Sequence, residues 1–280
     1  INSVTGPDEY TTMVDDNYYT NTMAKYHFEF VYRFYNQNKS ALRNICVKLK
    51  ANDHEIDALQ VAASRMYTCF DSHLNIFAQD NSFLQKPELD FKALPEDKFP
   101  LLLHYHPTFI YRHQVLKQAD VLLSMFLLDY DNMDIFNSSF DYYLKRTTHD
   151  SSLSKCIHSI VAFRLGHVDL GYEFLNEIVR MDMENTHKNT HHGLHIANSG
   201  GIYLAMTYGV LGLRIKEGKL VFRPHLPRQI PGIEYTFDFR GTKIKITLDQ
   251  KINILVSKPI EIGIYTDVIK ITDAYQCDYR

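Results

Sequence analysis

The sequence contains no tryptophan, only four cysteines and no long apolar run. The cysteines lie far apart without a Cys-x-x-Cys pair, which argues against a disulfide framework and favours a reducing compartment. No apolar stretch approaches the roughly 20 residues that cross a bilayer. The first residues also lack the basic and apolar regions of a secretory signal. We therefore expect a cytoplasmic protein without a membrane span.

A strong excess of charge is absent as well, since the net charge is −3 over 280 residues. Nucleic acids and anionic membranes bind proteins through clustered positive charge, so neither is an expected partner. Aromatic residues are plentiful by contrast, with 19 tyrosines and 17 phenylalanines. Such a composition suits stacking on sugar rings, and it suits an ordinary core equally well.

The first three quarters of the chain carry apolar residues at helical spacing. The predicted helices cover residues 17–37, 53–65, 107–128, 133–144, 151–165, 168–180 and 196–210. Short β-branched or alternating runs follow, and these predict strands at residues 219–223, 233–239, 243–248, 252–257 and 260–265. Helices followed by strands indicate two segregated layers or two domains. We place the boundary near residue 212, which gives domains 1–212 and 213–280.

One polar loop, Thr147–Ser154, leads into the helix predicted over 151–165. The first turn of a helix has unpaired N–H groups and the positive end of the helix dipole. Serines at such a position cap the helix, and they can also hold an anion. Ser151 and Ser152 are therefore candidate anion contacts, while a plain N-cap without any ligand remains the alternative.

Two further segments carry candidate catalytic groups. Glu9 follows Gly-Pro-Asp in a turn, where an apolar pocket would raise its pKa as a general acid requires. The alternative is that Asp8 and Glu9 are two solvated carboxylates. Lys117 and Gln118 fall inside the helix predicted over 107–128. There they require a polar cavity, unless the lysine extends into solvent.

Histidines and glycines gather near residues 187–201. The histidines of this segment are His187, His191, His192 and His195. Their irregular spacing and the lack of cysteine or carboxylate neighbours make a metal site unexpected. The Gly193-Leu194-His195 and Ser199-Gly200-Gly201 motifs instead indicate exposed backbone N–H groups near a small or anionic ligand. Close helix packing through small residues is the alternative.

Five motifs occur in order along nearly the whole chain. They are Gly6-Pro7-Asp8-Glu9-Tyr10, Lys117-Gln118-Ala119-Asp120-Val121, Thr147-x-His149-Asp150-Ser151-Ser152-Leu153-Ser154, Gly193-Leu194-His195-Ile196-Ala197 and Leu220-x-Phe222-x-Pro224-x-Leu226-Pro227. Together they resemble the inverting α-glucoside phosphorylases of glycoside hydrolase family 65. The resemblance implies half or more of an α/α six-hairpin toroid barrel, followed by a C-terminal antiparallel β-sandwich.

The resemblance also implies a role for individual residues. Glu9 takes the place of the general acid, and Lys117 and Gln118 those of the residues that bind the glucosyl unit. The implied phosphate contacts are Ser151, Ser152, His195 and Gly200. The reaction would be inverting phosphorolysis of an α-linked, maltose-like glucose disaccharide to β-glucose 1-phosphate and glucose. Phosphate would be the co-substrate, and no metal or organic cofactor is implied.

In the resembled family a β-domain and half of the helical barrel precede the acid motif. We therefore expect a C-terminal fragment whose partners are the upstream half of the enzyme, the disaccharide, phosphate and, in a homodimer, a second copy. One alternative is a hydrolase of the same family, similar to acid trehalases, with Asp150 or Asp120 as the base. The other is a non-catalytic carbohydrate-binding or assembly fragment.

Overall fold

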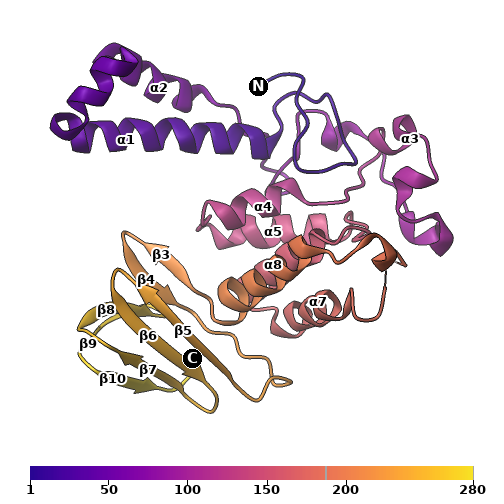
Figure 1. Cartoon of the computed structure of the whole chain (residues 1–280). Coiled ribbons are helices and arrows are strands. Elements are labelled where there is room, and N and C mark those ends of the chain that lie inside the picture. Colours follow the sequence, from indigo (N-terminus) through magenta and orange to yellow (C-terminus); the bar gives the residue numbers. More distant parts are fainter. Residues whose placement is uncertain (187, 280) are drawn as a thin grey trace. The chain divides into compact units, whose positions relative to one another are not determined.

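A computed structural model describes residues 1–186 and 188–279 (Figure 1). The chain divides into two compact units, Ile1–Ser151 and Ser152–Arg280, and each is described by itself. The first unit consists of helices, irregular segments and one short two-stranded ribbon, whereas the second begins with helices and ends in two sheets. Among the described residues, no helix combines the length and the apolar character that crossing a bilayer demands.

The first unit contains five α-helices and one small antiparallel ribbon. The helices are α1 (Tyr18–Leu49), α2 (Asp53–Arg65), α3 (Pro107–Tyr111), α4 (Asp120–Leu127) and α5 (Met133–Leu144). The ribbon pairs β1 (Phe70–Asp71) with β2 (Ile76–Phe77). Short 3-10 turns lie between, at η1 (Phe83–Gln85), η2 (Phe91–Ala93), η3 (Glu96–Lys98) and η4 (Leu101–Leu103). The predicted bounds of α2 and α5 are confirmed.

Helix α1 begins where predicted and runs further than predicted. Asn17 caps it, because its Oδ1 accepts the backbone N–H of Thr20 at 3.0 Å. The predicted end at Gln37 is wrong, since the helix passes a local distortion at Asn38 and ends at Leu49. No glycine or proline interrupts that stretch. Figure 1 shows α2 folding back along α1.

The single helix predicted over 107–128 is wrong. The chain leaves α3 after Tyr111, and α4 starts only at Asp120. Between them Leu116 pairs its backbone with residues 146–148, through a bond to the Arg146 carbonyl at 2.8 Å and one from Thr148 at 2.9 Å. This strand-like pairing satisfies the backbone groups that a helix would otherwise have satisfied. Lys117 and Gln118 therefore precede α4 instead of lying within it.

The helices of the second unit pack through glycines. They are α6 (Ser154–Arg164), α7 (Val168–Arg180) and α8 (Ile196–Leu204), which continues as a π-helix, η6 (Ala205–Val210); η5 (Thr190–His192) is a 3-10 turn. The predicted bounds of α7 are confirmed. A β-carbon at Gly171 or Gly209 would lie 2.9 or 2.8 Å from the ring of Phe163. The two glycines thus let α7 and η6 close on the buried Phe163 of α6.

The predicted serine cap of α6 is wrong. The helix begins at Ser154, its N-cap residue is Leu153, and no side chain makes a capping hydrogen bond there. Ser151 and Ser152 lie in the bend and turn before the helix. The polar groups of this loop are used in contacts within the loop and with neighbouring segments rather than in capping.

Two four-stranded sheets complete the second unit. Their strands are β3 (Arg214–Lys216), β4 (Lys219–Phe222), β5 (Ile233–Phe239), β6 (Thr242–Leu248), β7 (Ile252–Val256), β8 (Ile260–Ile264), β9 (Asp267–Ile271) and β10 (Ala274–Cys277). The sheet orders are β10-β7-β6-β5 and β3-β4-β8-β9. Both sheets contribute to one apolar core, for example through Ile246 and Ile262. Strands β3, β9 and β10 were not among the predicted strands.

The sandwich is not entirely antiparallel as predicted, because β4 and β8 pair in parallel. The chain leaves the second sheet after β4, forms β5 to β7 in the other, and returns in the same direction. Two-residue hairpins join β3 to β4 and β5 to β6. Helices end at Val210 and strands begin at Arg214, while the half-toroid and the two-domain division stay predictions.

Candidate active site

Four predicted site residues meet in the first unit. The Nζ of Lys117 lies 2.7 Å from Oε2 of Glu9, and the amide Nε2 of Gln118 donates to Oε1 at 3.0 Å. The same amide nitrogen lies 3.3 Å from Oγ of Ser151. Both carboxylate oxygens of Glu9 are therefore engaged by the two residues that the sequence assigned to sugar binding. The contact joins segments 108 residues apart in the chain.

The electrostatics of Glu9 differ from the prediction. Its side chain is 52% exposed, in a turn rather than an apolar pocket. Partial burial acts to raise the pKa of Glu9, but the hydrogen bonds from Lys117 and Gln118 and the charge of Lys117 outweigh it, so the net pKa is lowered. The predicted raised pKa is therefore wrong for this arrangement, because a cation and an amide donor face the carboxylate.

Asp8, beside Glu9, is the acid that the fold buries, so the alternative of two solvated carboxylates is also wrong. Its Oδ1 accepts the backbone N–H groups of Lys117 at 2.9 Å and Gln118 at 3.2 Å, and its Oδ2 accepts Nε2 of Gln79 at 2.9 Å. Burial raises the pKa of Asp8 to about 6, although these hydrogen bonds act to lower it. The acid motif thus contains one exposed and one buried carboxyl with opposite pKa shifts.

Tyr10 ties the acid loop to the polar loop that contains Ser151. Its buried phenol donates a hydrogen bond to Asp150 and accepts the backbone N–H of Leu101 at 2.9 Å. Burial and the nearby Asp150 charge raise the pKa of Tyr10, so the phenol stays protonated and remains a donor. Thr148 donates to the other oxygen of Asp150 at 2.8 Å. Sequence reasoning missed this link, because no local signal pairs residues so distant in the chain.

His195 occupies the N-cap position of α8 in the second unit. Asp182 holds it twice: the backbone N–H of His195 donates to Oδ2 at 2.9 Å, and Nδ1 lies 2.5 Å from Oδ1. This pair of contacts sets the orientation of the imidazole ring. Asp182 was not predicted, since nothing in its local sequence distinguishes it from a surface aspartate.

Gly200 lies on α8, and Ser152 lies in the turn before α6. A β-carbon at Gly200 would meet no atom within 4 Å, so this position is open. At Gly201 a β-carbon would lie 2.9 Å from Cβ of Cys156. Close packing through small residues therefore explains Gly201 and does not explain Gly200. The convergence of Ser151, Ser152, His195 and Gly200 on one phosphate stays a prediction.

Within residues 1–186 and 188–279, no group of three or more His, Cys, Asp and Glu side chains is arranged to hold a metal ion. His187, one of the four histidines considered for a metal, lies outside the described residues.

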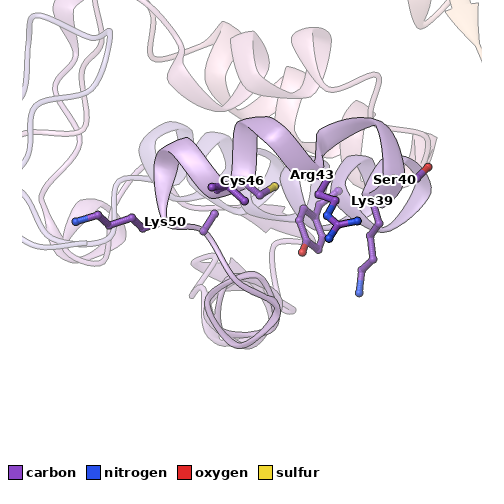
Figure 2. Close-up of a pocket in the computed structure, with 8 residues that line it drawn as sticks. Lys39, Ser40, Arg43, Cys46 and Lys50 are labelled. Atoms are coloured by element: carbon purple, nitrogen blue, oxygen red, sulfur yellow. The ribbon is translucent and has the colours of Figure 1, made fainter.

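An open pocket of about 450 Å³ lies on α1 (Figure 2). Basic residues are prominent in its lining, and none of the predicted site residues belongs to it. Lys39 is paired with Asp53 at 2.9 Å, and Figure 2 shows Lys50 extending away from Arg43. The cations therefore do not converge on one point, and we assign this pocket no role in the chemistry.

Comparisons with known proteins place both parts of the chain in one family. Residues 1–204 match the glycosyl hydrolase family 65 central catalytic domain, and residues 213–270 match the C-terminal domain of that family. The α,α-trehalose phosphorylase of Geobacillus stearothermophilus is 44% identical over 273 residues, which are 95% of this chain and 36% of the relative. That of Thermoanaerobacter brockii is 40% identical over 94% of this chain and 35% of its own length.

More distant relatives include the maltose phosphorylase of Bacillus subtilis, 29% identical over 96% of this chain and 36% of the relative. Among solved structures, a putative kojibiose phosphorylase from the human microbiome superposes with a TM-score of 0.92 at 26% identity, covering 99% of this chain and 38% of that one. The chain thus spans little more than a third of the length of these relatives. With both of its matched regions falling in one family, the chain belongs to glycoside hydrolase family 65.

Proposed function

We propose that this chain supplies the general acid, the glucosyl-binding residues and part of the phosphate site of an inverting phosphorylase of α-linked glucose disaccharides. The observation that carries the proposal is the arrangement of Glu9, whose two oxygens lie 2.7 and 3.0 Å from Lys117 and Gln118. Lys117 and Gln118 can donate hydrogen bonds to the hydroxyl groups of a sugar. Glu9, which lies between them, can at the same time protonate the glycosidic oxygen.

In the proposed reaction Glu9 protonates the glycosidic oxygen while phosphate attacks C1 from the opposite face. The C1–O bond to the leaving sugar breaks, a C1–O bond to phosphate forms, and an α-linkage becomes β-glucose 1-phosphate. An inverting hydrolase would need a second carboxylate to activate water on that face. A phosphorylase needs an anion site there instead, which we assign to Ser151, Ser152, His195 and Gly200.

Protonation of Glu9 is coupled to sugar binding in this proposal. Lys117 and Gln118 lower the pKa of Glu9 by bonding to its carboxylate. When the hydroxyl groups of the bound glucosyl unit take over those donors, the hydrogen bonds that lower the pKa of Glu9 are removed and only the charge of Lys117 still lowers it. The pKa of Glu9 then rises, and the carboxyl holds the proton that the leaving group requires.

The hydrogen bonding of the two candidate bases favours a phosphorylase over a hydrolase. Asp120 is fully buried, with its oxygens bonded to the Asp8 backbone and to Asn17. Asp150 accepts hydrogen bonds from Tyr10 and Thr148. Both oxygens of each carboxylate thus already accept hydrogen bonds, whereas a hydrolase requires a carboxylate that is available to activate water.

The disaccharide is the finer part of the proposal. The sequence resemblance named a maltose-like substrate, but the chain is more similar to the two trehalose phosphorylases than to the maltose phosphorylase. We therefore propose α,α-trehalose as the first substrate to test. Maltose, kojibiose and nigerose complete the series, since they differ only in the linkage between two glucose units.

The test uses the protein at its natural length, incubated with each disaccharide in the presence and absence of phosphate. We expect phosphate-dependent formation of glucose 1-phosphate, with the β-anomer identified by the C1 proton in NMR. Glu9→Gln, which keeps the size of the side chain and removes the transferable proton, should lower the rate by about 10²–10⁴-fold.

Other outcomes discriminate the alternatives. Release of glucose at the same rate without phosphate would identify a hydrolase. Binding of disaccharide, measured calorimetrically, without turnover under either condition would identify a non-catalytic carbohydrate-binding protein. Activity that appears only when this chain is mixed with the upstream half of the enzyme would identify that half as its partner.

A further inference from the structure

We propose that Asp8 and Asp120 are positioning residues, which form a buried carboxylate clamp that sets Glu9 against Lys117 and Gln118. This inference rests on the proposed function, because it concerns the placement of the proposed acid. The clamp consists of Asp8, Asp120 and the neutral partners Asn17 and Gln79. All four side chains are fully buried.

The first half of the clamp is the carboxylate of Asp8. Its Oδ1 accepts the backbone N–H groups of Tyr10 at 3.2 Å, Lys117 at 2.9 Å and Gln118 at 3.2 Å. These bonds hold the backbone on the C-terminal side of Glu9 and the backbone of both residues that contact it. One side chain therefore fixes the spacing between the acid loop and the loop that carries its two partners.

The second half is Asp120, at the first position of α4. Its Oδ1 accepts the backbone N–H of Asp8 at 2.8 Å, and its Oδ2 accepts Nδ2 of Asn17 at 2.9 Å. Asp8 thus holds the loop before α4, and α4 in turn holds Asp8. Glu9 lies between Asp8 and Tyr10, whose backbone N–H groups are bonded to Asp120 and Asp8. The main chain of Glu9 therefore has little freedom to shift.

The chemistry of the pair is specific to carboxylates. Both oxygens of Asp8 accept hydrogen bonds, and so do both oxygens of Asp120. An asparagine at either position would have only one acceptor oxygen, and its NH2 group would face another donor. Two acids in one buried network are expensive to desolvate, and their negative charges repel. The fold keeps both acids in spite of this cost, which favours a role in placing Glu9.

The test compares Asp8→Asn and Asp120→Asn in the protein at its natural length. Asp141→Asn is the matched control, since it makes the same change at an exposed position of α5. Asp120→Asn is the milder variant, because Asp8 keeps its bonds to Lys117 and Gln118. The variants are assayed for phosphorolysis of the disaccharide and of α-glucosyl fluoride. Fluoride leaves C1 as an anion without receiving a proton, so its departure does not require a general acid.

If the clamp positions Glu9, Asp8→Asn loses about 10²-fold in kcat on the disaccharide, the scale of an ångström-sized misplacement. Asp120→Asn loses less than Asp8→Asn and more than the control. On α-glucosyl fluoride they should lose only a few-fold, as should the control on both substrates. An equal loss on the two substrates would show a merely structural role and overturn the inference. Wild-type protein that turns over neither substrate would count against the proposed function, and the following measurement then decides the inference by itself.

The second measurement needs no turnover. In ¹³C NMR of the labelled side-chain carboxyl, Glu9 should titrate below its ordinary range in wild-type protein and in Asp141→Asn. In Asp8→Asn its pKa should move back up, because Lys117 and Gln118 are no longer held against it. In Asp120→Asn it should move up by less, because only the backbone bond that anchors Asp8 is lost. Folded variants in which the Glu9 pKa does not move would overturn the inference. Thermal unfolding and amide dispersion establish that each variant is folded before it is titrated.

Discussion

A β-carbon placed on Gly6 would lie 2.2 Å from Oδ2 of Asp120, far inside the contact distance of two non-bonded atoms. It would also lie 2.6 Å from Nδ2 of Asn17. Position 6 of the acid motif therefore requires glycine. A larger residue would leave no room for the hydrogen bonds that Asp120 makes with Asn17 and with the backbone of Asp8.

Gly6→Ala should therefore destabilise the first unit by about 1–3 kcal/mol, the usual cost of overpacking a site that cannot relax. The midpoint of thermal unfolding measures the effect. Gly200→Ala is the control, since a β-carbon there meets nothing within 4 Å and alanine favours a helix. A Gly6→Ala protein as stable as the wild type would show that Asp120 and Asn17 can move to accommodate a β-carbon, and it would contradict this prediction.

Lys117→Gln should shift the pH dependence of phosphorolysis. Lys117 lowers the pKa of Glu9 through a hydrogen bond and through its charge. Its removal raises the pKa of Glu9 in the free protein, and the acid stays protonated to a higher pH. The descending limb of kcat/KM against pH should therefore move upward in pH, while kcat/KM itself falls because a sugar contact is lost. A limb that stays in place would exclude Glu9 as the group that titrates.

The stability of the first unit should fall as the pH rises from about 4 to about 6. Burial raises the pKa of Asp8 from 3.8 to about 6, and burial, with the charges of Asp8 and Asp80, raises that of Asp120. The folded state then holds protons that the unfolded chain has released, so this stabilisation is complete below pH 3.8 and is lost as the folded carboxyls ionise. Urea unfolding across this pH range measures it.

Asp120→Asn removes one of these titrating groups and should flatten that dependence. Asp141→Asn, at an exposed position, should leave the slope unchanged. A slope that survives in Asp120→Asn would assign the pH dependence to other carboxyls of the unit.

Phe163→Ala should destabilise the second unit by about 3–5 kcal/mol, as for other large-to-small changes of buried aromatic residues. The ring is fully buried, and Gly171 and Gly209 pack directly on it. The loss leaves a cavity that the helices cannot close without moving. Val268→Ala, at a position 64% exposed on β9, should change stability by no more than about 0.5 kcal/mol. Similar midpoints for the two variants would contradict this account of the packing.

Local signals in the sequence predicted those elements whose ends depend on nearby residues. Asn52 and Asn132 cap α2 and α5, through bonds from the N–H groups of Glu55 and Ile135 at 3.0 and 3.2 Å. Alternation from Lys243 to Leu248 identified β6 and its buried face. Motifs in the sequence named Glu9, Lys117, Gln118 and Ser151 as candidates, and the structure brings these four residues together in the first unit.

Tertiary structure alone decided the conformation and the charge environment of that cluster. Pairing of Leu116 with residues 146–148 replaced a predicted helix by an extended segment, which brought Lys117 and Gln118 to Glu9. Burial of Asp8 beside Asp120, 112 residues away, could not be foreseen from a turn that looks polar. The sequence by itself determines residue types and their local spacing. The pKa of a carboxyl, in contrast, depends on which groups from distant parts of the chain surround it after folding.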